Sequence, residues 1–249
     1  MYANVQPVNQ QRHGNLKVTP VRNFDFARGL HLASIMINEF FRAASTYPIV
    51  FIEDQRTSDF RPVVMLGLKP EENLFVNDEG RWEATYIPAI IRRYPFALAR
   101  TQDEGRFTVC IDEDSPFLTD DAQAEGQPLF DQGQPGEVIE RVKKYLGELQ
   151  QMEMLTQQFC REFKEKNMFS PLNMRVRDAD AVRNITGAYA INEQRLGNLS
   201  DEDFLEIRRK NYLPAIYSHL TSLSQIERLI HLRDKVTHLT PDQVDTPMQ

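Results

Sequence analysis

The sequence has few cysteines: two in 249 residues, Cys110 and Cys160. One disulfide is the most that they could form. The first residues, MYANVQPVNQQRHGN, contain no apolar stretch of the kind that a secretory signal peptide carries. Because disulfides persist mainly in exported proteins, we predict two reduced, buried thiols and a cytoplasmic protein. Export to the cell surface without a leader is the alternative.

Long hydrophobic runs are also absent. The most apolar windows, YPIVFI and RPVVMLGL, are eight residues long or shorter, whereas a helix that crosses a membrane needs about twenty apolar residues. The chain is therefore expected not to be embedded in a membrane.

Basic residues are outnumbered by acidic ones. The 29 Lys and Arg against 36 Asp and Glu give a formal net charge of −7, and the pI is near 5.3. A nucleic-acid-binding protein normally presents an excess of positive charge, so no nucleic-acid partner is expected. The net negative charge does not argue against a protein or peptide partner, and such a partner is expected.

Signatures of catalysis and of cofactor binding are missing as well. The sequence contains no G-x-S-x-G, no Walker A motif and no G-x-G-x-x-G. None of its five histidines stands in H-x-H or H-E-x-x-H spacing. Asp112, Glu113 and Asp114 could hold a hard cation, but the pattern of an EF-hand loop is lacking and a solvated turn is the favoured alternative. We therefore expect no cofactor and no metal.

The first half of the chain shows a mixture of helix and strand patterns. Apolar residues at steps of three and four predict an amphipathic helix near 30–45. Runs rich in Val, Ile and Phe predict strands at 47–54, 61–69 and 73–77, and the short separators imply antiparallel pairing. Another strand is predicted at 105–114.

The second half is richer in helix patterns. Apolar spacing from 137 to 167 predicts one helix of about thirty residues, about 45 Å long. Alternating runs at 171–178 and 182–191 predict a hairpin with the sequence DADA at its turn. Ser200 is the predicted N-cap of a short helix, and a final helix is expected from 214 to 235.

These elements together predict an α+β fold. An antiparallel or mixed sheet of about six strands is expected to pack against the long helix and the C-terminal helix. Residues 26–236 are expected to form a single domain, between a flexible N-terminal arm at 1–25 and a flexible tail at 237–249. The stretch 119–136, rich in Asp, Gln, Gly and Pro, is a candidate internal loop.

One pentapeptide is nearly repeated: YIPAI at Tyr86–Ile90 and YLPAI at Tyr212–Ile216. Proline disfavours the α conformation in the residue before it and suits the first position of a helix. We interpret both copies as one kind of junction, in which an extended residue precedes a helix that begins at Pro88 or Pro214. An ancient duplication and a twinned binding site are the alternatives.

Trp82, Tyr86, Arg92 and Arg93 form the most binding-like cluster in the sequence. Arginine beside aromatic side chains suits a carboxylate or the backbone of a partner. Arginines that point outward from a short helix are the alternative. These four residues are our first candidates for binding a ligand.

Four more candidates are chosen by their chemistry. Asp112 and Glu193 are candidate acids, although Glu193 could instead cap a turn or face an arginine from the interior. Tyr217 and His219 stand together on the last predicted helix. A histidine in that place can act as a general base, or it can lie on the helix surface or be half-buried.

A series of motifs resembles the SapC family of bacterial proteins, in the family's order over roughly residues 45–230. The matching pieces are YPIVF, PVVMLGL, ENLFVNDEGRWEATYIPAIIRRYPFAL, CIDEDSP, GQPLFDQGQP, GAYAINEQRLGNLSDEDF and LPAIYSHLTSLSQIERL. Family-motif positions in this sequence are Trp82, Tyr86, Pro88, Arg92, Arg93, Pro95, Cys110, Asp112, Glu193, Tyr217 and Ser222. The resemblance implies a soluble protein linked to the bacterial surface layer (S-layer) or to a receptor and uptake gene cluster, and it supplies no catalytic residues.

Two hypotheses about function follow. The first is a non-enzymatic binding or structural protein of the surface layer or of a receptor and uptake system, with a protein or peptide partner. The second is an enzyme, or an accessory subunit of one, that acts on a peptide or amino-acid-like substrate through the Trp82–Arg93 cluster, with Asp112 and Glu193 as acids. The oligomeric state is not set by the sequence.

Overall fold

The structure, a computed structural model of the chain, describes residues 1–101, 107–177 and 182–239. By its internal contacts the chain divides into two units, and each unit is described by itself. Unit 1 comprises Met1–Arg28, Val76–Glu83 and Ile87–Leu155. Unit 2 comprises Gly29–Phe75, Ala84–Tyr86 and Thr156–Gln249.

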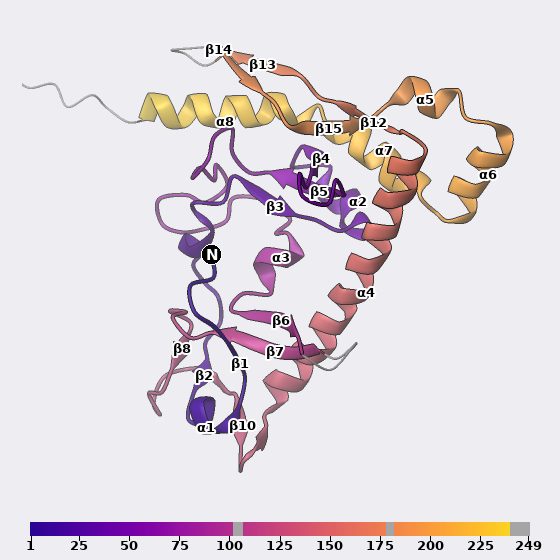
Figure 1. Cartoon of the computed structure of the whole chain (residues 1–249). Coiled ribbons are helices and arrows are strands. Elements are labelled where there is room, and N and C mark those ends of the chain that lie inside the picture. Colours follow the sequence, from indigo (N-terminus) through magenta and orange to yellow (C-terminus); the bar gives the residue numbers. More distant parts are fainter. Residues whose placement is uncertain (102–106, 178–181, 240–249) are drawn as a thin grey trace, which may run out of the picture. The chain divides into compact units, whose positions relative to one another are not determined.

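Unit 1 contains a three-stranded antiparallel sheet in the order β1–β7–β6 (Figure 1). These strands are β1 (Val5–Pro7), β6 (Phe96–Arg100) and β7 (Phe107–Asp112). Because residues 107–111 of β7 pair with β6, the strand predicted at 105–114 is confirmed over the described residues; residues 105 and 106 lie outside them. Shorter strands pair as β8–β2–β9 and β10–β11. They are β2 (Lys17–Val18), β8 (Leu118–Thr119), β9 (Gln127–Pro128), β10 (Phe130–Asp131) and β11 (Gln134–Pro135).

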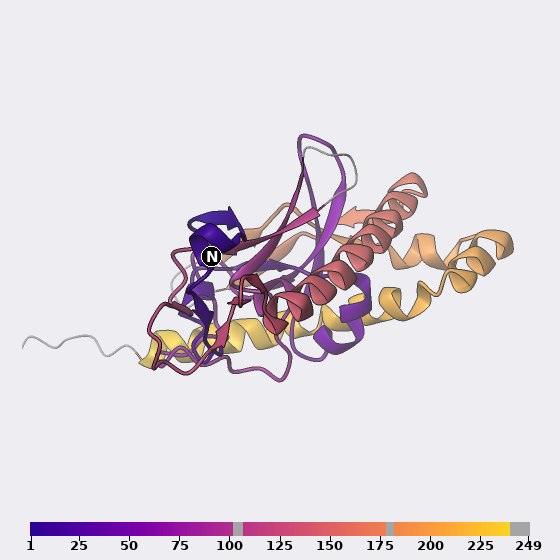
Figure 2. The ribbon, with the colours of Figure 1, turned by 90° about the horizontal axis from the view of Figure 1, so that it is seen from below.

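The core of unit 1 lies between β6, β7 and the first turns of α4 (Glu137–Glu165). Its buried members are Phe96, Val109, Ile111, Leu129, Val138, Ile139 and Leu146. On α4, Val138, Val142, Leu146 and Leu149 follow one another at steps of four and three, which places them on one face. α4 runs without a break (Figure 1, Figure 2), so the helix predicted from 137 to 167 is confirmed.

The first 25 residues, which we predicted to form a flexible arm, contain short paired and helical elements. β1 pairs with β7, with Val5 opposite Asp112, and α1 (Gln10–His13) buries His13 completely. A 3₁₀ turn, η1 (Asp25–Ala27), follows. These elements could not be predicted from apolar periodicity, because the side chains of β1 are exposed or half-buried. Backbone pairing and polar side chains hold the segment in place.

Unit 2 contains a five-stranded antiparallel sheet in the order β12–β15–β4–β5–β3. Its strands are β3 (Leu32–Ser34), β4 (Ile49–Glu53), β5 (Phe60–Met65), β12 (Phe169–Pro171) and β15 (Ala188–Ile191). β4 and β5 confirm the strands predicted at 47–54 and 61–69. The α+β class, the long helix and the C-terminal helix are confirmed, whereas the strands divide among several sheets and the largest has five members.

The predicted hairpin in the second half is present. β13 (Met174–Arg177) pairs antiparallel with β14 (Val182–Ile185). The DADA turn at 178–181 lies outside the described residues, as do residues 240–249 of the predicted tail. The division into one domain and two flexible ends stays a prediction.

The two faces of the unit 2 sheet carry different side chains. On one face Phe51 packs against Phe159 of α4 and Phe169 of β12, with ring centroids 6.3 and 4.7 Å apart. Phe60 lies 4.3 Å from Phe169 and extends the aromatic cluster. Because side chains alternate along a strand, Val50 and Ile52 point to the other face.

Helices complete unit 2. They are η2 (Ile37–Glu39), α2 (Phe40–Ala43), α5 (Glu193–Gly197), α6 (Asp201–Arg209), α7 (Leu213–Ser222) and α8 (Gln225–Leu239). The hydroxyl of Ser200 accepts the N–H of Asp203 at 3.1 Å, so its predicted role as an N-cap is confirmed. α7 packs against α2, β4 and β15. Within the described residues, no helix has both the length and the hydropathy to cross a membrane.

Two predicted elements in the first half are wrong. In place of a helix near 30–45, Leu32–Ser34 pair with β5, and only the short turns of η2 and α2 follow. The apolar spacing fits a half-buried strand and one helical turn as well as it fits a longer helix. Residues 73–77 form no strand, because the side chain of Asn73 accepts the N–H of Phe75 at 3.0 Å and bends the chain.

The final helix predicted from 214 to 235 is interrupted. α7 ends at Ser222 and α8 begins at Gln225. The hydroxyls of Ser222 and Ser224 donate to the carbonyls of His219 and Thr221, at 2.6 and 2.9 Å. Serine hydroxyls that bond nearby carbonyls compete with the regular helix, and the helix stops between them.

The two pentapeptides do not form identical junctions. Pro88 is the N-cap of α3 (Ala89–Arg92), with ψ of 141°. α7 instead begins at Leu213, one residue before Pro214, and Tyr212 before it is already in the helical region at φ −85° and ψ −20°. The prediction of proline at the first helical position is therefore wrong at both sites. Both prolines do stand where a helix begins, and Tyr86 and Tyr212 are both buried.

Candidate functional site

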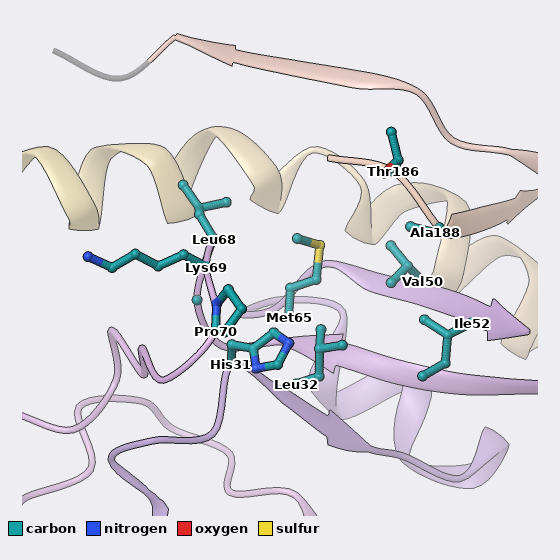
Figure 3. Close-up of a pocket in the computed structure, with 12 residues that line it drawn as sticks. His31, Leu32, Val50, Ile52, Met65, Leu68, Lys69, Pro70, Thr186 and Ala188 are labelled. Carbon is teal, nitrogen blue, oxygen red and sulfur yellow. The ribbon is translucent and has the colours of Figure 1, made fainter. Parts of the chain in front are cut away.

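A pocket lies on the face of the unit 2 sheet that points away from the aromatic cluster (Figure 3). Val50 and Ile52 of β4, Met65 of β5 and Ala188 of β15 form its floor, beside Leu32 of β3. The strand register brings these side chains together, because Ala188 stands opposite Ile52 and Leu32 opposite Met65, and residues paired across antiparallel strands share a face. The floor is apolar throughout.

The size of the pocket limits what can enter it. Its volume is about 150 Å³. An apolar cavity of about that size accommodates benzene in another protein. A branched aliphatic side chain or a single ring therefore fits, whereas a nucleotide or a haem does not.

The rim of the pocket is polar, and none of the described residues that line it is acidic. His31, Lys69 and Thr186 supply its polar side chains, with Leu68, Pro70 and the glycines at 67 and 187 between them. Ammonium, imidazole and hydroxyl groups can all donate hydrogen bonds. The rim therefore suits a ligand group that accepts hydrogen bonds or carries negative charge.

A tight turn holds the rim. Gly67 passes so close to the chain that a Cβ atom there would lie 2.2 Å from the carbonyl oxygen of Glu72. The N–H of Leu68 donates to Glu72 Oε2 at 2.8 Å. The N–H groups of Leu66 and Gly67 donate to the carbonyl of His31 at 2.8 and 3.1 Å. The two rim segments that carry Lys69 and His31 are thus tied to each other.

The ammonium of Lys69 has a weak partner. Its Nζ lies 3.7 Å from Glu72 Oε1, and its side chain is 49% exposed. The same Oε1 lies 3.7 Å from Nε of the buried Arg233. An ammonium carries three donors, so a shared carboxylate at this distance leaves Lys69 able to bond a ligand.

His219, a candidate general base, has a structural role. It is fully buried. Its Nε2 accepts the N–H of Ile191 at 3.0 Å, and its Nδ1–H donates to the carbonyl of Ile49 at 2.9 Å. Burial lowers the pKa of His219 from 6.5 to about 4, against the opposing effect of the Ile49 carbonyl. A neutral ring with both nitrogens engaged has no lone pair available for a substrate.

The neighbouring Ser222 acts on the same strand. Its hydroxyl accepts the N–H of Ile49 at 2.9 Å. Since Phe51 pairs with Tyr189, the register continues to Ile49 opposite Ile191, which is where the imidazole of His219 stands between the strands. His219 and Ser222 therefore satisfy backbone groups that the β4–β15 ladder leaves unpaired.

Asp112 is the centre of a buried polar cluster in unit 1. It is 1% exposed. Its carboxylate accepts the N–H groups of Ala3 and Asn4 at 3.1 and 2.7 Å and the hydroxyl of Tyr94 at 3.1 Å. Burial is the main cause that raises the pKa of Tyr94, and it also raises that of Tyr2. The carboxylate thus fastens the N-terminal segment to the end of β7.

Glu113, the next residue of the acidic run, also binds the N-terminal segment. Glu113 bonds Arg12 Nη2 at 2.6 Å and His13 Nε2 at 3.0 Å, while Asp114 is exposed. The favoured interpretation of a solvated turn is therefore wrong for Asp112 and Glu113. Among the described residues, no group of three or more His, Cys, Asp or Glu is placed to hold a metal ion.

In the structure, the four candidate residues between Trp82 and Arg93 contact different side chains. Trp82 packs edge-on against Phe24, with centroids 5.7 Å apart. Tyr86 belongs to unit 2, where its hydroxyl donates to the buried carboxylate of Glu39. Their role in binding a ligand stays a prediction.

The two arginines of this group also point to separate rings. The guanidinium of Arg92 lies 5.9 Å from the ring centre of Tyr145, and its Nε donates to the carbonyl of Ile87 at 2.9 Å. Arg93 lies over the ring of Tyr2, also at 5.9 Å. Burial raises the pKa of Tyr2, and the nearby Arg93 lowers it while Asp112 raises it, so both of these candidates act on Tyr2 in unit 1.

The remaining candidates are on the surface of unit 2. Glu193 is exposed in the first turn of α5, where a negative charge favours the helix. Asn192 caps that helix by accepting the N–H of Arg195 at 2.9 Å, so Glu193 is neither the cap nor a buried acid. Tyr217 is 53% exposed on α7, while His219 two residues later is buried.

The sequence-based search missed every residue that lines the pocket. It looked for reactive side chains, whereas the floor consists of aliphatic ones. The sequence RPVVMLGLKP could have indicated the pocket, because a continuous apolar run indicates a strand with apolar side chains on both of its faces. The glycine, lysine and proline that end the run belong to the rim. Cys110 and Cys160 are both buried and are not joined in a disulfide, which confirms the prediction of two thiols.

Comparison with known proteins gives one match. The family model for SapC matches residues 8–229 of the chain. No curated protein matches, and no solved structure matches. The matched range includes most of both units and the described residues that line the pocket.

Proposed function

The chain belongs to the SapC family, and from that premise we propose that it is a binding protein whose unit 2 holds an apolar side chain of a peptide or protein partner. The observation that carries this proposal is the pocket on the sheet. A concave, mostly apolar site with a few convergent polar groups is the usual form of a ligand site. Val50, Met65 and Ala188 provide the apolar floor, and His31 and Lys69 the polar groups.

The state of the candidate catalytic residues supports binding over catalysis. Using His219 as a base would break its bonds to two strands, at Ile49 and Ile191. Asp112 already accepts three hydrogen bonds. The alternative of an enzyme acting on a peptide requires the Trp82–Arg93 residues to share a site, and the contacts of Trp82, Arg92 and Arg93 are with three different rings.

The surface layer suggested by the family resemblance is the natural place to seek the partner. A surface-layer protein, or a receptor of an uptake system, would present the side chain that enters the pocket. This assignment is part of the proposal and is tested by the identity of the bound partner.

The proposal is tested by titrating the ¹⁵N-labelled protein with short Gly–Ser peptides that carry one leucine or none. We expect amide shifts to concentrate at Val50, Met65 and Ala188 for the leucine peptides alone. Ala188→Leu fills the pocket and should weaken binding at least about tenfold, since it removes the space for the apolar group.

Ala190→Leu is the matched control. Ala190 lies on the same strand, is similarly buried (7% against 6% exposed) and does not line the pocket. Thermal unfolding of both variants shows whether they remain folded. Equal binding of the leucine and leucine-free peptides, or equal losses in the two variants, would refute the proposed function.

A further inference from the structure

Resting on the proposed binding role, we infer that the pocket recognises a chain terminus: an apolar C-terminal residue whose free carboxylate bonds to the rim while its side chain occupies the floor. The apolar part follows from the floor and its size. The carboxylate follows from the chemistry of the rim, and the chain terminus follows from the peptide or protein partner of the proposed function.

The charge of the rim points to an anion. The chain as a whole has 36 acidic against 29 basic residues, yet every polar side chain on the described lining (His31, Lys69 and Thr186) can donate. A carboxylate held by an ammonium and neutral donors forms charge-assisted hydrogen bonds, which are stronger than neutral ones.

Lys69 stands at the outer edge of the rim, and its side chain extends away from the floor (Figure 3). The close approach of Gly67 to Glu72 and the Leu68 N–H bond to Glu72 fix the turn that carries Lys69. Its own ion pair is long, at 3.7 Å, and half of its side chain is exposed. A ligand carboxylate can approach the ammonium without first displacing a strong internal partner.

The state of the nearby acid discriminates between kinds of carboxylate ligand. A free amino acid would bring an ammonium beside its carboxylate, and the carboxylate beside Lys69, that of Glu72, already pairs with Lys69 and Arg233 and accepts the N–H of Leu68. A peptide C-terminus carries an amide at that place instead. Capture of a C-terminal carboxylate is an established mode of peptide recognition. A short branched fatty acid shares the same carboxylate and apolar group and is separated by experiment.

The experiment compares four probes by calorimetry and by ¹⁵N shifts. They are an N-acetylated Gly–Ser peptide ending in leucine with a free carboxylate, the same peptide as its C-terminal amide, free leucine and 4-methylpentanoate. We expect the acid peptide to bind about fivefold or more tightly than the amide, as suits one half-exposed charge pair. Free leucine and 4-methylpentanoate should bind more weakly than the acid peptide.

Two lysine variants isolate the rim. Lys69→Gln should abolish the preference for the acid over the amide, and Lys69→Arg should retain it. Lys143→Gln is the matched control, because Lys143 is 48% exposed and also pairs with a glutamate three residues away, as Lys69 does. The control should leave the preference unchanged.

The outcomes separate the inference from the function on which it rests. Equal binding of acid and amide, with both lost in Ala188→Leu, overturns the carboxylate and leaves the binding role intact. Equal binding of 4-methylpentanoate and the acid peptide overturns the chain terminus. Failure of every leucine peptide to bind overturns the proposed function itself.

Discussion

At the scale of single residues, His219 and Ser222 show how polar side chains can complete a sheet from a neighbouring helix. Both lie on α7, and both bond Ile49, the first residue of β4. A buried backbone N–H or carbonyl without a partner costs about 1–3 kcal/mol. The motif around LPAIYSHLTS thus has a structural meaning in this chain that does not depend on catalysis.

The lowered pKa of His219 predicts how stability depends on pH. The unfolded chain takes up a proton near pH 6.5, while the folded protein resists protonation down to about pH 4. The contribution of His219 to the free energy of unfolding is therefore complete above pH 6.5. It declines as the pH falls from 6.5 to 4, by roughly 3 kcal/mol in total. Urea unfolding at pH 7.5, 6 and 4.5 measures this slope.

Substitution of His219 separates its contribution to the pH dependence of stability from the contributions of the other titrating groups. His219→Gln should be less stable than the wild type at pH 7.5, and the difference between them should shrink toward pH 4.5. His231→Gln, at an exposed position of α8, should follow the wild-type curve. An NMR titration that shows His219 protonating near pH 6.5 in the folded protein would contradict the prediction.

At the scale of elements, the turn between β5 and the 73–77 segment is defined by one glycine. Gly67→Ala places a Cβ atom 2.2 Å from a backbone oxygen, so the turn must shift. We expect a loss of about 2 kcal/mol or more in unfolding free energy and weaker peptide binding, because Lys69 moves with the turn. Denaturant unfolding and the leucine-peptide titration measure the two effects.

Gly147 is the matched control for Gly67. It lies in α4, and a Cβ atom there has no neighbour within 4 Å. Gly147→Ala should raise the unfolding free energy by about 0.8 kcal/mol, since alanine favours the helix over glycine. Equal effects of the two substitutions would show that the close approach at Gly67 does not govern the turn.

Elements with a long, regular pattern could be predicted from the sequence, and short ones could not. Apolar spacing over about eight helical turns identified α4, and β-branched runs identified β4 and β5. The helix predicted at 30–45 was wrong because three residues of strand and one helical turn have the same apolar spacing as a longer helix. Residues 5–7 could not be assigned to a strand from the sequence, because β1 is held by its pairing with β7 and carries little apolar pattern of its own.

The candidate site was harder to predict than the fold. Its floor depends on which strands are neighbours, since Ala188 reaches Ile52 across more than a hundred residues of sequence. Reactive residues such as Asp112 and His219 attracted the search because of their chemistry, yet both are used to satisfy backbone groups. A sequence gives residue types directly, whereas a pocket made of aliphatic side chains requires the register.

At the scale of the whole molecule, one continuous helix supplies the cores of both units. Leu146 of α4 belongs to the core of unit 1, and Phe159 and Phe163 of the same helix are fully buried in unit 2. Loss of the helix in one unit would remove support from the other. We therefore propose that residues 26–236 unfold cooperatively as a single domain, as their sequence led us to expect.

Leu146→Ala tests this coupling, because it cuts a side chain that is 1% exposed in unit 1 and should cost about 2–5 kcal/mol. In a single cooperative domain, native-state hydrogen exchange should show the protection of β4 in unit 2 falling as much as that of β6 in unit 1. Met154→Ala, on the same helix but 60% exposed, should change neither. If β6 alone loses protection, or calorimetry resolves two transitions, the two units fold separately, and the binding role assigned to unit 2 could then be tested on that unit alone.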